Sequence, residues 1–274
     1  MSDISIKQFK ITQSKPAKIT FTAILALSLL AIIAVPVYLG YTSNKKASAY
    51  LDGFDPGNIM SDFVMSNKST MTESDIQNFL KSKNPCNDTN LAKAAPYQAQ
   101  GYQYTIRDGH FVCMADDTFN GETAAHIIWQ AAQDYNINPQ VLIVLLEKEQ
   151  SLVTDTWPNN RQYAKATGFN CPDTGGCEAK DAGFKNQVRK AAALFREVLD
   201  GGYSGYPAYT SSLIYYHPNA SCGGSYVYIQ NRATSALYRY TPYQPNGAAL
   251  AAGTGAGDAC SSYGNRNFYN LFTE

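Results

Sequence analysis

The pattern of apolar and polar residues divides the chain into an uncharged N-terminal stretch and a longer region with helical periodicity. Residues 19–44 carry no charge and are rich in leucine and isoleucine, and a segment of this length and composition can cross a bilayer. We therefore expect a single-pass transmembrane anchor at residues 19–41. Four lysines precede it, so the positive-inside rule predicts that residues 1–18 are cytoplasmic and that everything after the anchor lies outside the plasma membrane. Cleavage after Ala49, in an Ala-Ser-Ala sequence, would instead release a secreted protein.

Beyond the anchor, the pattern predicts a linker and then one mostly helical domain. Residues 42–70 are polar and rich in glycine, serine, asparagine and aspartate, as linkers are, which leaves residues 71–274 for the domain. Residues 84–118 lack helical periodicity and predict loops with one or two short strands. Apolar residues at three- and four-residue steps, or capping sequences, predict helices that begin at 72 and span 124–135, 139–153, 184–199, 231–240 and 248–252, with a strand at 226–229.

Two glutamates stand near the end of the helix predicted at 139–153, and helix geometry separates them. Glu149 has leucine or valine three and four residues away on both sides, which predicts that it lies on the apolar face. Glu147 is followed at these steps by Gln150 and Ser151, so we expect it nearer to solvent. Burial of a carboxyl group disfavours its ionised form, which suits a general acid that protonates a glycosidic oxygen. The alternative for Glu149 is a structural ion pair with a basic side chain, for which the candidates are Arg161, Arg189 and Lys190.

Residues 131–151 resemble the catalytic-helix signature of soluble lytic transglycosylases and related glucosaminidases. In these families a proline starts the helix and the catalytic glutamate follows it at the spacing that separates Pro139 from Glu149. The resemblance therefore implies that Glu149 is the catalytic residue. Gln150 stands where these families usually have serine, and Ser151 comes next.

The segment Ala166-Thr167-Gly168-Phe169 resembles the glycine-containing loop that lines the sugar cleft in the same families, although their Gly-Leu-Met-Gln run is absent. The resemblance implies that Thr167, Gly168 and Phe169, together with Ser151, bind substrate. Residues 52–274 also resemble a branch of secreted bacterial lysozyme-like proteins, sometimes called haemagglutinins. The implied fold class is α+β and mostly α, with a lysozyme-like domain that follows an N-terminal transmembrane helix.

The activity implied by the resemblance is cleavage of the MurNAc-GlcNAc backbone of peptidoglycan. Lytic transglycosylases use one glutamate, because the 6-hydroxyl of the muramic sugar attacks its own anomeric carbon. Ordinary hydrolysis as a lysozyme or glucosaminidase needs a partner carboxylate, for which Asp155 and Asp173 are candidates. A catalytically inactive adhesin that binds the wall or its sugars is the alternative function. Peptidoglycan strands are thus the expected partner, and neither a cofactor nor a metal is implied.

Tyrosines are frequent in the C-terminal half of the chain. Aromatic rings stack on the apolar faces of sugars, and phenol hydroxyls form hydrogen bonds at the rim of such sites. We select Tyr216, Tyr240 and Tyr243, as a group, as candidates for substrate binding.

The cysteines predict disulfide bonds. All six follow the anchor, where an oxidising compartment allows pairing, and their even number leaves none over. Of the 15 connectivities that six cysteines allow, nearest-neighbour pairing closes the shortest loops, namely Cys86 with Cys113, Cys171 with Cys177 and Cys222 with Cys260. A structural zinc site is the alternative, although the chain has no Cys-x-x-Cys pair.

The charge distribution argues against nucleic acid as a partner. The chain has 22 basic and 22 acidic side chains, but six of the lysines precede residue 47, so the outer region is acidic. Phosphate binding needs a basic surface.

Overall fold

The computed structural model describes residues 53–171, 177–203 and 205–274 of the chain. The expected cytoplasmic segment 1–18, the expected anchor at 19–41, the cleavage position at Ala49 and the candidate Asp173 lie outside the described residues. In the part that is described, no helix combines the length and the apolar character needed to cross a membrane.

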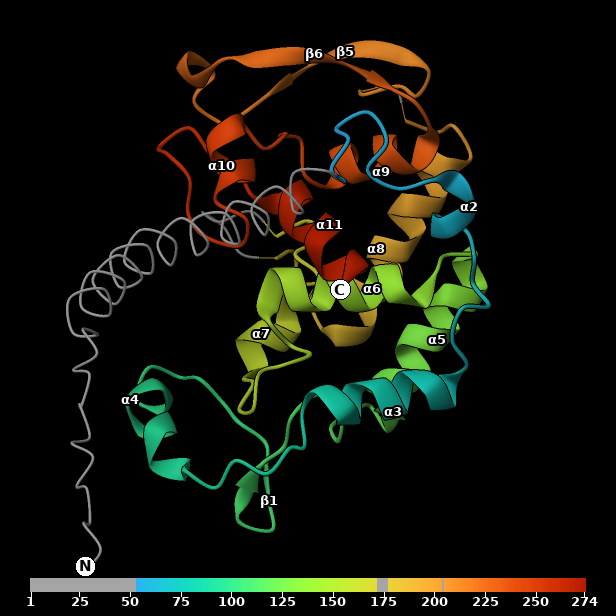
Figure 1. Ribbon diagram of the computed structural model, residues 1–274. Helices are drawn as coiled ribbons and strands as arrows, with labels where there is room; N and C mark the ends of the chain where they lie inside the picture. The colour runs from blue at the N-terminus through green and yellow to red at the C-terminus, as the bar shows by residue number, and fades with distance from the viewer. Residues whose placement is uncertain (1–52, 172–176, 204) are drawn as a thin grey trace, which may run out of the picture. The chain divides into compact units, whose positions relative to one another are not determined.

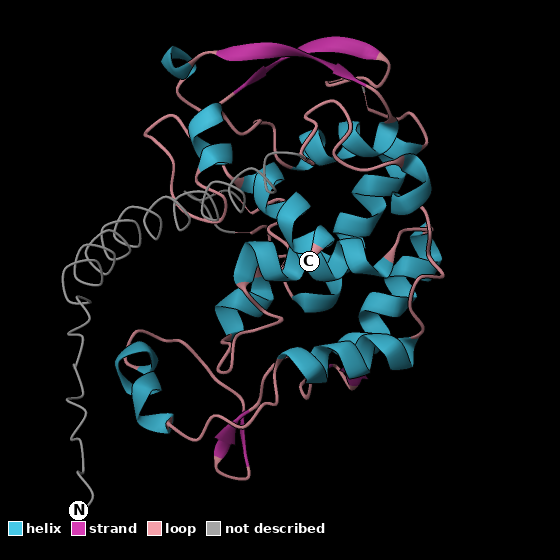
Figure 2. Ribbon diagram, in the orientation of Figure 1, coloured by secondary structure: helices cyan, strands magenta, loops and turns pink. Residues whose placement is uncertain are grey.

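The described residues form a helical domain with three small β-hairpins (Figure 2). Helix α6 packs against α5, α8 and α11, which surround it in Figure 1. The helices are α2 (Asp62–Met65), α3 (Glu73–Lys83), α4 (Ala95–Gln98), α5 (Ala124–Tyr135), α6 (Pro139–Gln150), α7 (Asn160–Ala164), α8 (Phe184–Leu199), α9 (Arg232–Tyr240), α10 (Gly247–Ala251) and α11 (Gly264–Thr273). The strands are β1 (Ile106–Arg107), β2 (His110–Phe111), β3 (Thr118–Phe119), β4 (Glu122–Thr123), β5 (Thr210–Tyr215) and β6 (Gly224–Ile229).

Most of the helices form where the capping residues and the apolar period place them. Thr72 and Asp75 form the predicted capping box of α3. Asn136 ends α5 with a left-handed backbone, and the side chain of Asn138 accepts a hydrogen bond from the backbone of Gln140 to begin α6. These short signals bring α5 and α6 together at a tight turn, and α6 carries apolar residues from Val141 to Leu146 into the core.

The domain begins earlier than the sequence pattern predicts. Residues 53–70 were assigned to the linker because of their polar composition, but Ile59, Met60 and Met65 are buried in the core. The backbone of Ile59 also donates a hydrogen bond to the Thr234 hydroxyl on α9. A few apolar side chains among many polar residues are enough to attach this segment to the domain.

Strands β5 and β6 form an antiparallel hairpin that runs from the pair Thr210 and Ile229 to the pair Tyr215 and Gly224. Cys222, in the turn of this hairpin, is bonded to Cys260. The other disulfides join Cys86 to Cys113 and Cys171 to Cys177, so the nearest-neighbour pairing is confirmed. With all six cysteines bonded, neither a thiol nucleophile nor a cysteine-ligated zinc ion is available to this domain.

Candidate functional site

Glu149 lies in the last turn of α6, where the helix stops at Gln150. Ser151 takes a left-handed backbone with φ of 54°, and its N–H donates to the carbonyl of Glu147. The helix therefore ends before Leu152 and Val153, so the prediction that these residues extend the apolar face around Glu149 is wrong. The Glu149 side chain is 26% exposed, which makes it accessible at the edge of the core rather than enclosed by it.

A loop containing Gly168 lies directly against the Glu149 carboxylate. A Cβ atom placed on Gly168 would be 3.3 Å from Oε2 of Glu149, and Gly168 has φ of +74°, a conformation that favours glycine. A side chain at this position would be strained by the backbone conformation and would press on the Glu149 carboxylate. The glycine that the sequence comparison selected is thus placed beside the acid that it selected.

Gln187 of α8 holds this loop in place, and the sequence analysis did not select it. Its buried side-chain oxygen accepts hydrogen bonds from the backbone of Thr167 at 3.3 Å and of Phe169 at 3.0 Å. Its nitrogen donates to the carbonyl of Phe169 at 2.9 Å. A glutamine on the otherwise apolar face of α8, next to Val188, is the signal that could have identified it.

Tyr240 holds the same loop from the side of α9. Its hydroxyl donates to the carbonyl of Thr167 at 2.5 Å. Burial of the hydroxyl raises the pKa of Tyr240 well above its ordinary value, and the nearby charge of Glu149 adds to the increase. Tyr240, Thr167 and Gly168 therefore gather at Glu149. The Thr167 side chain is buried and donates to the carbonyl of Gln187, so the loop presents its backbone near Glu149.

Lys148 is the second feature that the sequence analysis missed. Its ammonium group forms an ion pair with Oε1 of Glu149, and its side chain is only 8% exposed. The same nitrogen lies 3.5 Å from the Thr241 hydroxyl. None of the basic residues proposed as partners from the sequence makes this pair. One oxygen of Glu149 is therefore occupied by a cation, and the other faces Gly168.

The neighbouring acid, Glu147, serves the fold. Its Oε2 accepts hydrogen bonds from the backbone of Val153 at 3.0 Å and of Thr154 at 3.2 Å, and its Oε1 accepts one from the Thr154 hydroxyl at 2.7 Å. Glu147 thus fixes the turn that follows α6.

Of the two candidates for a second carboxylate, Asp155 has a structural role and Asp173 lies outside the described residues. Asp155 accepts hydrogen bonds from the backbone of Trp157 at 3.0 Å and from the Gln162 side chain at 2.7 Å. These contacts stabilise a turn, as its position after α6 predicts. Asp173 belongs to the segment that is not described.

The remaining predicted site residues are not brought to Glu149 by any hydrogen bond in the described structure. Ser151 caps α6 and is exposed. Tyr216 donates from its backbone to Gly223 in the β5–β6 turn, and Tyr243 pairs with Tyr215 beside β5. Phe169 follows Gly168 and is partly buried. Of the three tyrosines that were selected, the structure places Tyr240 at the site.

Residues 58–203 match the family described as LasA, N-terminal domain. The match covers more than half of the chain, which therefore belongs to this family of secreted bacterial proteins. The family is linked to peptidoglycan-degrading enzymes, and membership relates the chain to proteins that act on the bacterial cell wall. No curated protein and no solved structure matches the chain.

Proposed function

We propose that this protein is a membrane-anchored, lysozyme-like peptidoglycan glycosidase that cleaves the MurNAc-GlcNAc backbone as a lytic transglycosylase, with Glu149 as its one catalytic carboxylate. The observation that carries the proposal is the close approach of Gly168 to Oε2 of Glu149. Gln187 and Tyr240 hold the loop there through its backbone, and preorganised surroundings of this kind are typical of catalytic groups.

In the proposed reaction Glu149 acts first as an acid and then as a base. It gives its proton to the bridging oxygen as the bond from the anomeric carbon to that oxygen breaks. The 6-hydroxyl of the same muramic sugar then attacks the anomeric carbon and loses its proton to Glu149. The strand ends in a 1,6-anhydro sugar, no water is consumed, and the enzyme returns to its starting protonation state.

Of the candidates for a second carboxylate, Asp155, the one that the structure describes, is engaged by Trp157 and Gln162, which favours a single-glutamate reaction over hydrolysis with Asp155. An inverting or retaining hydrolase needs a second carboxylate free to activate water or to attack the sugar. The proposed anchor at 19–41 would hold the domain next to the wall, which is where its substrate lies.

A sugar-binding adhesin without activity is the second candidate, and the ion pair between Lys148 and Glu149 favours it. A carboxylate that serves only as the partner of a lysine has a structural role and delivers no proton. The two candidates differ in whether substrate displaces Lys148 from Oε1.

Mass spectrometry of purified peptidoglycan incubated with the full chain tests the proposal. We expect soluble fragments with 1,6-anhydro muramic ends. Reducing muramic ends, heavier by one water molecule, would identify a hydrolase, and reducing glucosamine ends would identify a glucosaminidase. Sedimentation of the protein with intact, uncleaved peptidoglycan would support the adhesin.

A further inference from the structure

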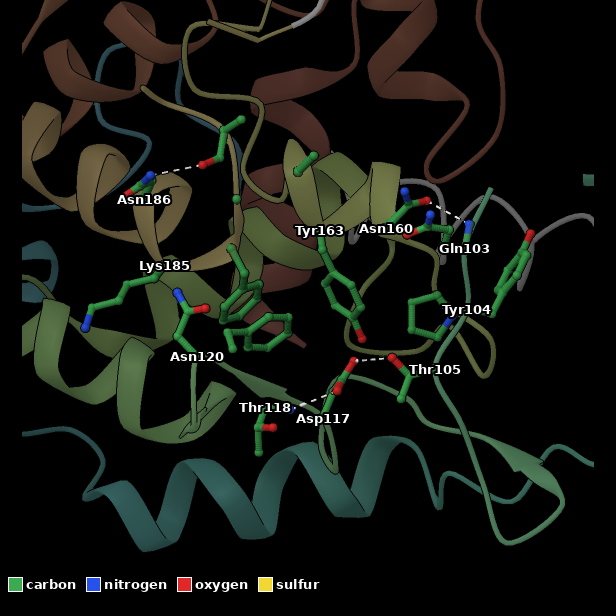
Figure 3. A pocket seen from close by; sticks show the side chains of 16 residues that line it. Gln103, Tyr104, Thr105, Asp117, Thr118, Asn120, Asn160, Tyr163, Lys185 and Asn186 are labelled. Atoms are coloured by element: carbon green, nitrogen blue, oxygen red, sulfur yellow. Dashed lines mark hydrogen bonds between the residues drawn. The ribbon is translucent and has the colours of Figure 1, made fainter. Parts of the chain in front are cut away.

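A pocket surrounds Tyr163 at a distinct part of the described domain. Its volume is about 810 Å³, within the range of small-molecule sites. It lies between the segment before β1, the start of β3, helix α7 and the first turn of α8 (Figure 3). Glu149, Gly168 and Tyr240 do not line it. We refer to it as the Tyr163 pocket.

Carboxamide side chains supply much of the polar surface of the Tyr163 pocket. Gln103, Asn120, Asn160 and Asn186 all line it. The Asn160 side chain accepts a hydrogen bond from the backbone of Gln103 at 2.9 Å (Figure 3), which fixes its orientation. A carboxamide can donate and accept at once. The Asn186 nitrogen already donates to the carbonyl of Ala182 at 3.0 Å, so Asn186 offers its oxygen and Asn160 its nitrogen to a ligand that carries several hydroxyl or amide groups.

Aromatic rings form the apolar wall. Phe119 stacks on Phe184 with ring centroids 4.1 Å apart, and Tyr163 meets Phe119 edge-on at 4.8 Å. A wall of rings facing carboxamides is the surface on which sugar rings stack while their hydroxyls bind at the side.

An acid and a phenol lie together at the base of the pocket. Asp117 is 8% exposed, and burial raises its pKa although the backbone of Thr118 and the Thr105 hydroxyl donate to it. The Tyr163 hydroxyl points toward Asp117 (Figure 3) and is buried without a well-formed hydrogen bond to any residue that the structure describes. Burial and the neighbouring charge of Asp117 raise the pKa of Tyr163, so the phenol stays protonated beside the acid.

The charges at the pocket favour a neutral ligand. Among the described residues that line it, the charged ones are Asp117 and Lys185. Lys185 already forms an ion pair with Glu122 at 2.6 Å. Among the described lining residues, no positively charged side chain is therefore free to pair with an anionic ligand.

Tyr104 also lines a second, smaller hollow. Its volume is about 210 Å³, and its lining includes Tyr97, Tyr102 and Trp157. Tyr104 belongs to both hollows and stacks on Trp157 with ring centroids 5.5 Å apart. Two adjoining aromatic hollows suit consecutive units of a chain better than one isolated small molecule.

We propose that the Tyr163 pocket and the smaller hollow at Tyr104 form a saccharide-binding site for N-acetylated glycan chains. The amides bind the hydroxyl and acetamido groups, and the partly exposed rings of Tyr104 and Phe119 contact the sugar faces, with buried Phe184 supporting Phe119 from behind. The choice of a glycan rests on the proposed function, but the site binds whether or not Glu149 cleaves.

Isothermal titration calorimetry of the full chain with tetra-N-acetylchitotetraose tests this site. Tyr104→Leu removes the ring shared by the two hollows, and Asn120→Gly removes one amide at a position with φ of 55° that glycine adopts freely. We expect each to weaken binding at least tenfold. The matched control is Tyr226→Leu, which removes a 77% exposed ring from β6, outside the pocket, and should bind as the unchanged chain does.

Three outcomes would overturn the proposal. They are no binding by the unchanged chain at millimolar sugar, equal affinity in all three variants, and binding of a peptidoglycan stem peptide in place of the sugar. Cleavage plays no part in the titration, so a failure here leaves the role of Glu149 untouched. Conversely, if the protein does not cleave peptidoglycan, binding measured in the titration still supports the saccharide site.

Asp117→Asn adds a readout that separates binding from structure. Because the folded protein raises the pKa of Asp117, its contribution to stability is full at low pH and is lost as pH rises through the folded value. The variant lacks this pH-dependent loss, so its stability should change less between low and neutral pH than that of the unchanged chain, although its amide nitrogen cannot accept from the Thr105 hydroxyl. It should bind the sugar more weakly. A large loss of stability with unchanged binding would assign Asp117 to the fold.

Discussion

The last turn of α6 carries two glutamates whose surroundings differ completely. On one side, Glu147 accepts three hydrogen bonds from Val153 and Thr154, all from the turn that follows the helix. On the other side, Glu149 meets Lys148 with one oxygen and the Gly168 loop with the other. The loop on that side is held by residues from α8 and α9, far away in sequence.

The difference teaches how to tell a structural acid from a candidate catalytic one. The donors around Glu147 are local and occupy both of its oxygens. Its carboxylate therefore stabilises the turn that ends α6. Glu149 lies against a fixed glycine loop, and its side chain is partly exposed. Few hydrogen-bond donors reach its carboxylate. A carboxylate that the structure positions without saturating it is available to a substrate.

Apart from substitution of Glu149 itself, the largest effect is expected from Gly168→Ala. The added methyl group would press on Oε2 of Glu149, and an alanine with φ near +74° is strained by about 1 kcal/mol. Misplacing a catalytic group by a fraction of an ångström slows the reaction, so we expect a loss of about tenfold in peptidoglycan cleavage. Release of soluble fragments per folded molecule measures it.

Gly109→Ala is the matched control for this substitution. Gly109 has φ of +78°, and no atom lies within 4 Å of the position its Cβ would take. Gly109→Ala should lower the free energy of unfolding about as much as Gly168→Ala does, and it should leave peptidoglycan cleavage unchanged. Equal losses of activity in both variants would show that backbone strain, and not contact with Glu149, is responsible.

Glu147→Gln should affect stability and leave cleavage per folded molecule intact. The amide nitrogen cannot accept the hydrogen bonds that one of the two oxygens receives, so at least one donor of Val153 or Thr154 loses its partner. The free energy of unfolding should fall by about 1–2 kcal/mol. Urea denaturation measures the change, and an unchanged midpoint would mean that the turn does not depend on Glu147.

A smaller effect is expected from Tyr240→Phe, which leaves the carbonyl of Thr167 without its donor. The cost at neutral pH should be about 1 kcal/mol. Because burial raises the pKa of Tyr240 above its ordinary value of 10, its stabilising effect is present below about pH 10 and is lost above it, as the unfolded tyrosine ionises. Above pH 10 the stability of the variant should therefore fall less steeply than that of the unchanged chain. Equal slopes in urea titrations at these pH values would contradict this account of Tyr240.

Local signals in the sequence predicted much of the helical structure. The end of α5 at Tyr135, the start of α6 at Pro139 and the apolar period of α8 each depend on neighbouring residues, and each was predicted correctly. The end of α6 was placed three residues too late, because the period of leucines and valines continues past the residue at which the backbone turns. Strand β5 and helix α11 were missed, although Phe268, Leu271 and Phe272 of α11 stand at three- and four-residue steps that are typical of a helix.

The site itself could be predicted only in part. Glu149, Gly168 and Tyr240 were selected from the sequence, and the structure brings them together. Gln187 was not selected, because its contacts depend on how α8 packs against the Gly168 loop. Lys148 was not selected either, although it is the chain neighbour of Glu149. The Tyr163 pocket could not be predicted, since its lining comes from four segments that only the fold assembles.

The central claim is tested most directly by comparing Glu149→Gln with Glu147→Gln on the same peptidoglycan, at equal concentrations of folded protein. The glutamine at 149 keeps the shape of the side chain but delivers no proton, so we expect cleavage to fall by at least about 100-fold. The variant at 147 should release anhydro fragments at the rate of the unchanged chain. Full cleavage by Glu149→Gln, with or without a loss in Glu147→Gln, would contradict the account.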